Sequence, residues 1–336
     1  MTDRLRWGIL GTGNIARQFA GGVRSSRRCV IAAVGSRAAA TAGEFAGNYR
    51  VPAAYGSYDE LLADRDVDAV YNSLPNNLHH DWTIKALGAG KHVLCEKPFA
   101  MDHREALEMF DAARQAKRVL VEAFMYRSHP LTKAVVDTIR SGAIGEVRLI
   151  RTSFCYRTTK IAGNVRFAPE LGGGALMDVG CYCINFSRLI TGAEPTSSYA
   201  AARKHTTGVD EVVVASMEFA GGVLASFTAG MGVQADNTAY VCGTEGYIEI
   251  PVPWKPPVNG AVYTIARGTP PRQDNPKPAT IPPRVTCTVD ANVDLYGLEA
   301  DDFAATVLDG APPVITEADT LGNMAVLDEM RRCIDK

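Results

Sequence analysis

Residues 7–16, WGILGTGNIA, decide the fold of the N-terminal part of this chain. An apolar run that predicts a strand leads into the pattern Gly11-x-Gly13-x-x-Ala16, and a helix is predicted from about Asn14. Gly11 permits a tight turn, Gly13 lets the backbone approach a phosphate, and the small Ala16 lets helix and strand pack closely. Because the glycines lie between a strand and a helix N-terminus, the pattern predicts a loop that binds the pyrophosphate of a dinucleotide.

The residues around this loop repeat a strand–helix unit. Five apolar segments are typical of strands, at 4–10, 29–36, 68–74, 91–96 and 119–124. Helical patterns follow the first four of them, at about 14–25, in the alanine-rich segment after the second strand, at 79–90 and at 102–117. Repeated units of this length predict an α/β fold with a parallel, doubly wound sheet, and strands that are apolar throughout are typical of sheets covered on both faces. We therefore expect a Rossmann domain over residues 1–124.

Residues 125–336 are patterned differently and predict an α+β domain with a large, mostly antiparallel sheet. The segments 146–157, 210–230 and 239–250 alternate like strands, and the second is expected to fold into a hairpin at Gly221 and Gly222. Helices are expected at 131–142, from about Gly173 to Ile190, and twice after Asp294. Ten of the 18 prolines lie between Pro251 and Pro283, and we interpret that segment as an extended excursion from the sheet.

The composition argues against several classes of function. The 336 residues carry 35 basic and 37 acidic side chains, so there is no basic excess for a nucleic-acid surface. No apolar run approaches the roughly 18 residues of a membrane helix, and the N-terminus lacks the apolar core of a signal peptide. The eight cysteines are too sparse for a disulfide scaffold, and the His and Cys spacings match no metal site. We expect reduced cysteines, no metal, no nucleic-acid or membrane partner, and a cytoplasmic protein.

The end of the second predicted strand, VGSR, distinguishes the two dinucleotides. An NAD site usually carries Asp or Glu at this position, which accepts from the ribose 2′-OH. Ser36 and Arg37 instead supply a hydroxyl and a guanidinium, and a guanidinium suits a phosphate in both geometry and charge. The sequence therefore favours NADP over NAD, and the alternative is that Arg37 is a solvated residue that opens the next helix.

Two further segments carry side chains suited to catalysis. Glu96 and Lys97 follow the fourth predicted strand, at the edge of the sheet where ligands lie, and Pro98 prevents a helix from starting there. In LGGGALMDVGCYCIN, residues 171–185, Asp178 and Tyr182 are four residues apart and share one helix face. An acid and a phenol so placed can hold a substrate hydroxyl and transfer its proton. The alternatives are a surface lysine, an aspartate at a helix N-terminus and a core tyrosine.

Together these motifs resemble the Gfo/Idh/MocA family of oxidoreductases. The resemblance covers essentially the whole chain and rests on GTGNIA at 11–16, LPNNLHHDWTIKALGAGKHVLCEKP at 74–98, EAFMYRSHP at 122–130 and GGGALMDVGCYCIN at 172–185. It is strongest to the branch with glucose–fructose oxidoreductase, dimeric dihydrodiol dehydrogenase and NADP-dependent xylose dehydrogenase, which has Tyr where much of the family has His. The resemblance implies that residues 125–336 bind the substrate and form a homodimer or higher oligomer through their sheet. It also implies a cis peptide bond between Lys97 and Pro98.

The resemblance also assigns roles to residues. Lys97 and Tyr182 would be the catalytic pair, with Asp178 and Arg166 as further substrate contacts. The motifs and the resemblance together predict that the dinucleotide contacts Gly11, Gly13, Asn14, Ile15, Ser36, Arg37, Leu74, Pro75, Asn76, His79, Glu96, Lys97 and Arg127.

The implied reaction is hydride transfer between NADP(H) and a carbinol or carbonyl carbon of a sugar, polyol or dihydrodiol. A ketosugar reductase in a biosynthetic pathway and a cofactor-binding regulator without turnover are the alternatives, and the presence of both Lys97 and Tyr182 argues against the regulator. A nearby ammonium favours a phenolate, so Lys97 is expected to lower the pKa of Tyr182. We favour Tyr182 as the immediate proton donor, with Lys97 tuning it, and the sequence leaves Lys97 open for that role.

Overall fold

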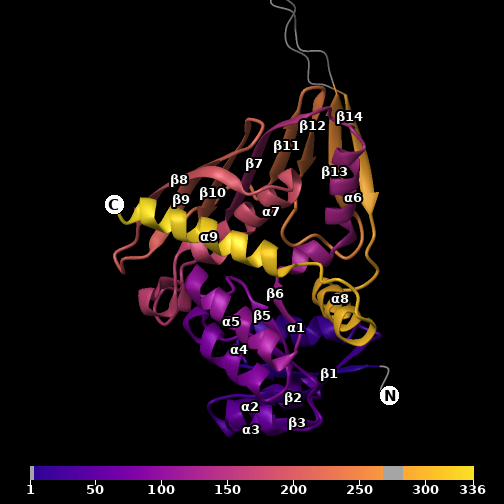
Figure 1. The fold of residues 1–336 in the computed structure, drawn as a ribbon, viewed down its shortest axis with the longest axis vertical. Coiled ribbons are helices and arrows are strands. Elements are labelled where there is room, and N and C mark those ends of the chain that lie inside the picture. Colours follow the sequence, from indigo (N-terminus) through magenta and orange to yellow (C-terminus); the bar gives the residue numbers. More distant parts are fainter. Residues whose placement is uncertain (1–3, 268–282) are drawn as a thin grey trace, which may run out of the picture.

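The computed structural model describes residues 4–267 and 283–336 and contains two sheets (Figure 1). The N-terminal sheet is parallel, with six strands in the order β3-β2-β1-β4-β5-β6. Its strands are β1 (Leu5–Leu10), β2 (Cys29–Gly35), β3 (Ala53–Tyr55), β4 (Ala69–Asn72), β5 (His92–Glu96) and β6 (Leu120–Ala123). The strand order reverses between β1 and β4, which is the arrangement of a doubly wound Rossmann sheet. The predicted fold of this part is therefore confirmed.

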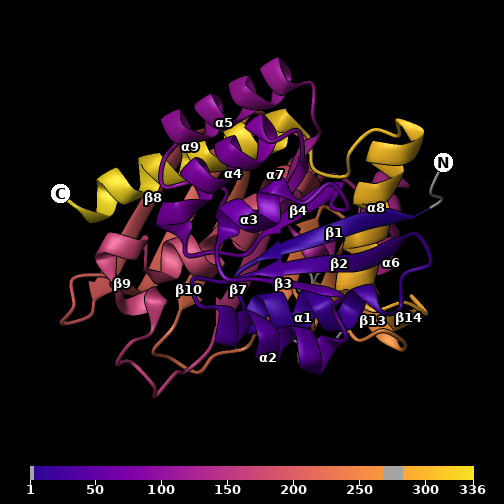
Figure 2. The same cartoon turned by 90° about the horizontal axis from the view of Figure 1, so that it is seen from below.

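Helices cover both faces of the N-terminal sheet (Figure 2). They are α1 (Asn14–Val23), α2 (Ala39–Tyr49), α3 (Tyr58–Ala63), α4 (His79–Gly88) and α5 (His103–Ala116). The side chain of Asp102 begins α5 by accepting from the Glu105 backbone N–H at 2.8 Å, as an N-cap residue does. Strand β3 and helix α3 were not predicted, because elements of three and six residues are too short to show a hydrophobic period.

The second sheet has eight strands in the order β14-β13-β12-β11-β7-β10-β9-β8, and it is antiparallel except where β10 pairs with β7. Its strands are β7 (Val147–Cys155), β8 (Pro195–Lys204), β9 (Asp210–Phe219), β10 (Val223–Gly230), β11 (Ala239–Gly243), β12 (Gly246–Ile250), β13 (Ala261–Arg267) and β14 (Arg284–Val289). The predicted hairpin is confirmed, since β9 and β10 pair across Gly221 and Gly222, which both have positive φ. The predicted mostly antiparallel sheet is likewise confirmed.

Three features of this sheet differ from the sequence-based expectation. Residues 239–250 form two antiparallel strands, β11 and β12, rather than one. Strand β8 was not predicted. The proline-rich segment contains β13, β14 begins directly after it at Arg284, and residues 268–282 of the segment lie outside the described part of the chain. The prolines before β13 end at Pro257, so this strand retains the backbone N–H groups that pairing needs.

Four helices complete the second half: α6 (Pro130–Arg140), α7 (Cys181–Thr191), α8 (Leu295–Asp309) and α9 (Glu317–Ile334). A π-helical turn, Leu176–Gly180, leads directly into α7. The His129 ring caps α6 by accepting from the Leu131 N–H at 3.1 Å. Helices α6, α7 and α9 pack on one face of the second sheet, as Figure 1 shows. No helix in the described residues is long and apolar enough to cross a membrane.

Helix α8 returns to the N-terminal half and packs against α1 (Figures 1 and 2). The rings of Trp7 and Phe303 lie 4.9 Å apart, and Gly22 provides the space for this crossing, because a Cβ there would lie 2.7 Å from Cβ of Tyr296. One continuous hydrophobic core therefore spans both sheets. The proposed domain boundary after residue 124 stays a prediction. Helix α8 follows this boundary in the sequence but packs against α1, which precedes it.

Candidate active site

A cavity of about 790 Å³ lies where the carboxyl ends of the parallel strands meet the second half of the chain. Its walls include every predicted site residue except Arg127. The N-terminal half contributes the glycine loop, Ser36, Arg37 and the residues after β4 and β5, and the second half contributes Tyr156, Arg166, Asp178, Tyr182, Lys255 and Tyr296. The cavity therefore combines the predicted cofactor residues with the predicted catalytic residues.

The glycine loop has the geometry that a pyrophosphate needs. Gly11 has φ +97°, a conformation that favours glycine, and its N–H donates to the Gly35 carbonyl at 3.0 Å. A Cβ added at Gly13 would meet no atom within 4 Å, so the backbone there is open to a ligand. Helix α1 begins at the next residue, Asn14, and its N-terminal N–H groups favour an anion. These residues fit the phosphates of a dinucleotide.

The end of β2 provides the second contact expected for the cofactor. Ser36 is buried, and Arg37 is exposed at the edge of the cavity. The acidic residues in the described walls are Glu96 and Asp178, which belong to the opposite end of the cavity. Among the described residues of the cavity, no carboxylate therefore lies beside Arg37 to accept a hydrogen bond from a ribose 2′-OH. The choice of NADP stays a prediction.

The loop after β4 connects the two ends of the cavity. The His79 ring is fully buried between two carbonyls, with Nδ1 2.9 Å from Pro98 O and Nε2 2.8 Å from Leu74 O. Burial lowers the pKa of His79 to about 4, so the neutral ring donates to only one of these carbonyls at neutral pH. Asn76 donates to the Gly172 carbonyl at 2.9 Å and so ties this loop to the glycine run of the second half.

Lys97 lies at the catalytic end, after β5. Its peptide bond to Pro98 is cis, as expected. The ammonium Nζ donates to the Asp178 carbonyl at 2.8 Å, lies 3.4 Å from Asp178 Oδ1, and lies 5.0 Å from the centroid of the Tyr182 ring. Burial of the ammonium opposes its charge, but the Asp178 carboxylate outweighs this effect and the pKa of Lys97 is raised. Lys97 is therefore a charged donor at neutral pH.

Asp178, in the π-helical turn, is the centre of the polar network. Its Oδ2 accepts from the Tyr156 hydroxyl and from Arg166 Nε at 2.9 Å. Burial opposes the carboxylate charge, but Lys97 and Arg166 outweigh it and the pKa of Asp178 is lowered. Because Oδ2 already has two donors, Oδ1 is the oxygen that retains capacity for a substrate hydroxyl.

Tyr182 differs in one respect from the expectation. Its side chain is 3% exposed, and its hydroxyl donates to the Met125 thioether at 3.2 Å. Burial, with a further contribution from Glu96, raises the pKa of Tyr182 well above its usual value. The predicted lowering by Lys97 is wrong for this structure, because the ammonium lies against the ring while the hydroxyl is desolvated. Tyr182 is therefore a neutral phenol that can donate a proton.

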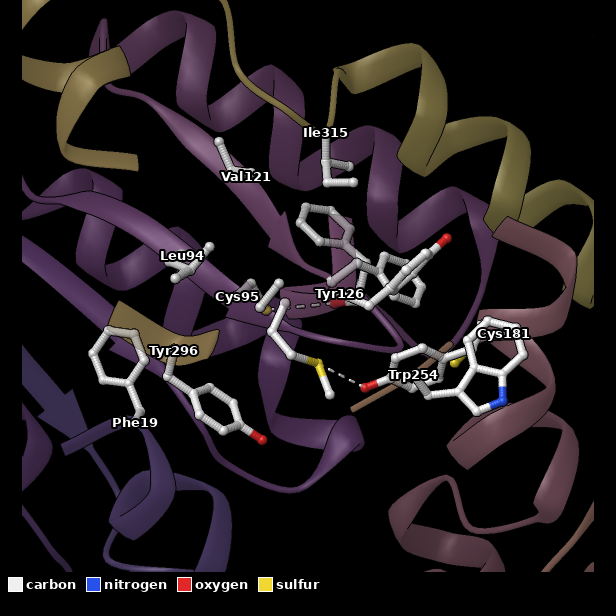
Figure 3. Close-up of a cluster of buried hydrophobic side chains, with 14 of the residues drawn as sticks. Phe19, Leu94, Cys95, Val121, Tyr126, Cys181, Trp254, Tyr296 and Ile315 are labelled. Carbon is white, nitrogen blue, oxygen red and sulfur yellow. Dashed lines mark hydrogen bonds between the residues drawn. The ribbon is translucent and has the colours of Figure 1, made fainter. Parts of the chain in front are cut away.

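An apolar wall surrounds this tyrosine. Trp254 packs its indole 5.7 Å from the Phe154 ring and 5.9 Å from the Tyr182 ring, measured between centroids. Figure 3 shows Trp254 beside Cys181 and near Tyr126, and shows Phe19 beside Tyr296 on the other side of the cluster. This apolar packing lowers the local dielectric around Tyr182, and a low dielectric strengthens electrostatic interactions.

Two predicted residues have roles that the sequence did not indicate. Glu96 is buried and accepts from the Tyr71 hydroxyl and from the Lys97 N–H at 3.2 Å, and burial raises its pKa. Arg127 does not line the cavity, and its guanidinium donates to Asn185 Oδ1 and to the Val314 carbonyl, each at 3.2 Å. The structure thus separates Arg127 from the other predicted cofactor residues.

Sequence reasoning missed seven polar residues of the cavity: Thr12, Gln18, Tyr58, Ser73, Tyr156, Lys255 and Tyr296. Tyr156 is the second-last residue of the segment 146–157 that was expected as a strand, so its position near a strand end was a usable signal. Lys255 precedes two prolines and carries no pattern that distinguishes it from a surface lysine. No group of three or more His, Cys, Asp or Glu side chains that could hold a metal ion occurs in residues 4–267 and 283–336.

Two family models match this chain. One, described as "Oxidoreductase family, NAD-binding Rossmann fold", matches residues 5–124, and the other, described as "GFO/IDH/MocA C-terminal domain", matches residues 132–249. Together they include the glycine loop, Lys97, Asp178 and Tyr182.

Individual relatives match over most of their length. D-xylose 1-dehydrogenase (NADP(+)) 2 of Haloferax volcanii is 35% identical over 96% of this chain and 95% of the relative. Trans-1,2-dihydrobenzene-1,2-diol dehydrogenase of Mus musculus is 37% identical over 75% of this chain and 76% of the relative. The structure of KijD10, a 3-ketoreductase from Actinomadura kijaniata in complex with NADP and TDP-benzene, superposes with a TM-score of 0.87 at 30% identity and covers 98% of both chains.

Proposed function

The chain belongs to the Gfo/Idh/MocA family of oxidoreductases, as its motifs predicted, and we propose that it transfers hydride between NADP(H) and a carbinol or carbonyl carbon of a sugar, polyol or dihydrodiol. One observation carries this proposal. Lys97, Asp178 and Tyr182 line the same cavity as the glycine loop that fits a dinucleotide. NADP is the proposed cofactor because Arg37, rather than a carboxylate, follows β2. The relatives named for NADP are in agreement with this choice.

When bound, NADP(H) would supply or accept the hydride at the nicotinamide C4. The protein would hold its pyrophosphate at Gly13 and the N-terminus of α1, and its 2′-phosphate at Ser36 and Arg37. Glu96 and Lys97, after β5, lie at the cavity end where the reacting carbon would be.

The polar residues of the second half would orient the reacting oxygen. Lys97 donates a charge-assisted hydrogen bond, and Asp178 Oδ1 accepts from the substrate hydroxyl. Tyr182 donates the proton in the reduction direction, since its raised pKa keeps the phenol protonated. Its present acceptor, the Met125 thioether, is weak, so a substrate oxygen competes for this proton at little cost.

The test is turnover of NADP(H) with matched panels of aldoses, 3-ketosugars and aromatic dihydrodiols, followed by the nicotinamide absorbance. Lys97→Met and Tyr182→Phe should each lower kcat by roughly a hundredfold or more while NADPH still binds. Tyr263→Phe is the matched control, because it removes a hydroxyl that bonds to Thr138 at 2.8 Å, outside the cavity. NADPH binding without turnover of any panel member would reject this function in favour of a regulator.

A second candidate is reduction of a ketosugar in a biosynthetic pathway. The similarity to the 3-ketoreductase over 98% of both chains favours it. Greater kcat/KM for the 3-ketosugars with NADPH than for the aldoses with NADP⁺ would select this candidate.

We also propose a cytoplasmic homodimer. The eight cysteines all lie in described segments and form no disulfide, which suits a reducing compartment. On the sheet face opposite the helices, Tyr199, Val214 and Leu224 are 62%, 58% and 52% exposed. Apolar side chains exposed on one broad face are typical of a contact with a second copy.

A further inference from the structure

The substrate end of the cavity carries more cations than anions. Lys97, Arg166 and Lys255 line this end, together with the carboxyl groups of Asp178 and Glu96. Asp178 forms ion pairs with both Lys97, at 3.4 Å, and Arg166, at 2.9 Å. Glu96 is buried and accepts from the Tyr71 hydroxyl and from the Lys97 N–H, and burial raises its pKa. The Asp178 carboxylate thus forms ion pairs with two cations, whereas Lys255 forms no ion pair with any described residue.

Arg166 keeps most of its donors available. Only its Nε is engaged, with Asp178 Oδ2, and neither terminal amino group has an acceptor among residues 4–267 and 283–336. The side chain is 45% exposed and lines the cavity. The outer edge of a guanidinium is a two-donor fork that matches a carboxylate or a phosphate.

Lys255 provides a second cation from a different part of the fold. Its Nζ donates to Gln18 Oε1 at 3.2 Å, and the Tyr296 hydroxyl donates to the same oxygen at 3.2 Å. An ammonium has three donors, and because Lys255 lines the cavity, two of them remain available to a bound group. Desolvation lowers the pKa of Lys255, the charges of Lys97 and Arg166 act in the same direction, and those of Glu96 and Asp178 oppose them. Lys97 and Arg166 line the same cavity and repel the charge of Lys255.

We propose that Arg166 and Lys255 form a subsite for an acid group of the substrate, so that the preferred sugar carries a carboxylate or a phosphate away from its reacting carbon. This proposal rests on the proposed function, because it names the substrate class of the same cavity. An anion between the two cations would relieve their repulsion and satisfy donors that the protein leaves without acceptors. A neutral sugar would leave Lys255 without an ion-pair partner and the terminal amino groups of Arg166 without a charged acceptor among the described residues.

The phosphates of the dinucleotide are the competing explanation for Lys255. The structure offers these phosphates another site, since Gly13 and the N-terminus of α1 would receive the pyrophosphate, and Arg37 would receive the 2′-phosphate. Arg166 belongs to the network of Asp178, which is the substrate end. These positions favour the substrate as the source of the anion.

The test compares sugars that differ only in one acid group. Glucuronate with glucose, and galacturonate with galactose, are titrated into the NADPH-saturated protein, with glucose 6-phosphate to distinguish phosphate from carboxylate. At least one acidic sugar should bind about tenfold or more tightly than its neutral counterpart, as expected for a charge-assisted contact. Lys255→Met should remove most of this preference, whereas Lys133→Met, which removes an exposed lysine of α6, should keep it.

The outcomes separate this proposal from the proposed function. Equal or weaker binding of every acidic sugar, including the absence of any binding, would overturn the subsite. A loss of NADPH affinity in Lys255→Met with an unchanged acid preference would also overturn it and assign Lys255 to the dinucleotide. A retained acid preference in a protein that shows no NADP(H) turnover would support the subsite and reject only the proposed reaction.

Discussion

Replacing Arg37 with alanine tests which dinucleotide the protein prefers. Arg37 follows β2 at the edge of the cavity and is exposed, whereas Ser36 beside it is buried. The cavity walls described for this chain carry carboxylates only at Glu96 and Asp178, at the other end. The guanidinium is therefore the group that should distinguish a 2′-phosphate from a 2′-hydroxyl.

The exposure of Arg37 sets the size of the effect. A hydrogen bond to a charged group contributes about 1.5 to 3 kcal/mol. Solvent screening places an exposed guanidinium near the lower limit, about 1.5 kcal/mol, which is roughly tenfold in affinity. Arg37→Ala should thus weaken NADPH binding about tenfold and leave NADH binding nearly unchanged.

The assay is fluorescence titration of NADPH and NADH into the wild-type protein and the variant. Arg27→Ala is the matched control, because it removes an exposed arginine of the same half of the chain that does not line the cavity. Added salt should reduce the NADPH preference of the wild type more than that of Arg37→Ala. Equal losses for both cofactors, or an unchanged NADPH affinity, would refute the role of Arg37 as the 2′-phosphate contact.

Tyr156→Phe removes a donor from the carboxylate of Asp178, so the pKa of that carboxyl should rise and its charge should be lost at a higher pH as the solution is acidified. The acid limb of kcat/KM should move up by about one pH unit, and an unmoved limb would contradict this role of Tyr156. Gly22→Ala should destabilise the protein by about 1 to 3 kcal/mol in denaturant unfolding, because its Cβ would overlap α8. Gly21→Ala, where a Cβ meets no atom within 4 Å, should be neutral or stabilising, and equal effects of the two variants would argue against the α1–α8 contact. Light scattering at micromolar concentration should give the mass of a dimer, and Leu224→Arg on the open sheet face should shift it toward the monomer, whereas a monomeric wild type would exclude the dimer.

Sequence patterns were reliable where one segment carries the whole signal. The glycine loop combines a strand, a turn and a helix in ten residues, so its position and geometry followed from local sequence. The hairpin at Gly221 and Gly222 was predicted for the same reason. The short elements β3 and α3, and strands β8, β13 and β14, gave too weak a period to be recognised.

The sequence identified the residues of the site better than it predicted the surroundings of each side chain. Lys97 and Tyr182 were both expected in the site, and both line the cavity. The protonation of Tyr182 was not predictable, because desolvation of its hydroxyl opposes the field of Lys97 and depends on how deeply the ring is buried. Arg127 shows the same limit, since its guanidinium is engaged by Asn185 and Val314 outside the cavity.

The sequence by itself determined the family, the parallel Rossmann sheet and the candidate residues Lys97, Asp178 and Tyr182, because motifs and hydrophobic periods are properties of neighbouring residues. Only the tertiary structure decided which side chains act together. Tyr156, Arg166 and Lys97 meet at Asp178, and Lys255 meets Gln18, across long separations in the chain. Such contacts depend on how the second sheet and its loops pack over the strand ends of the first, and no local pattern encodes that packing.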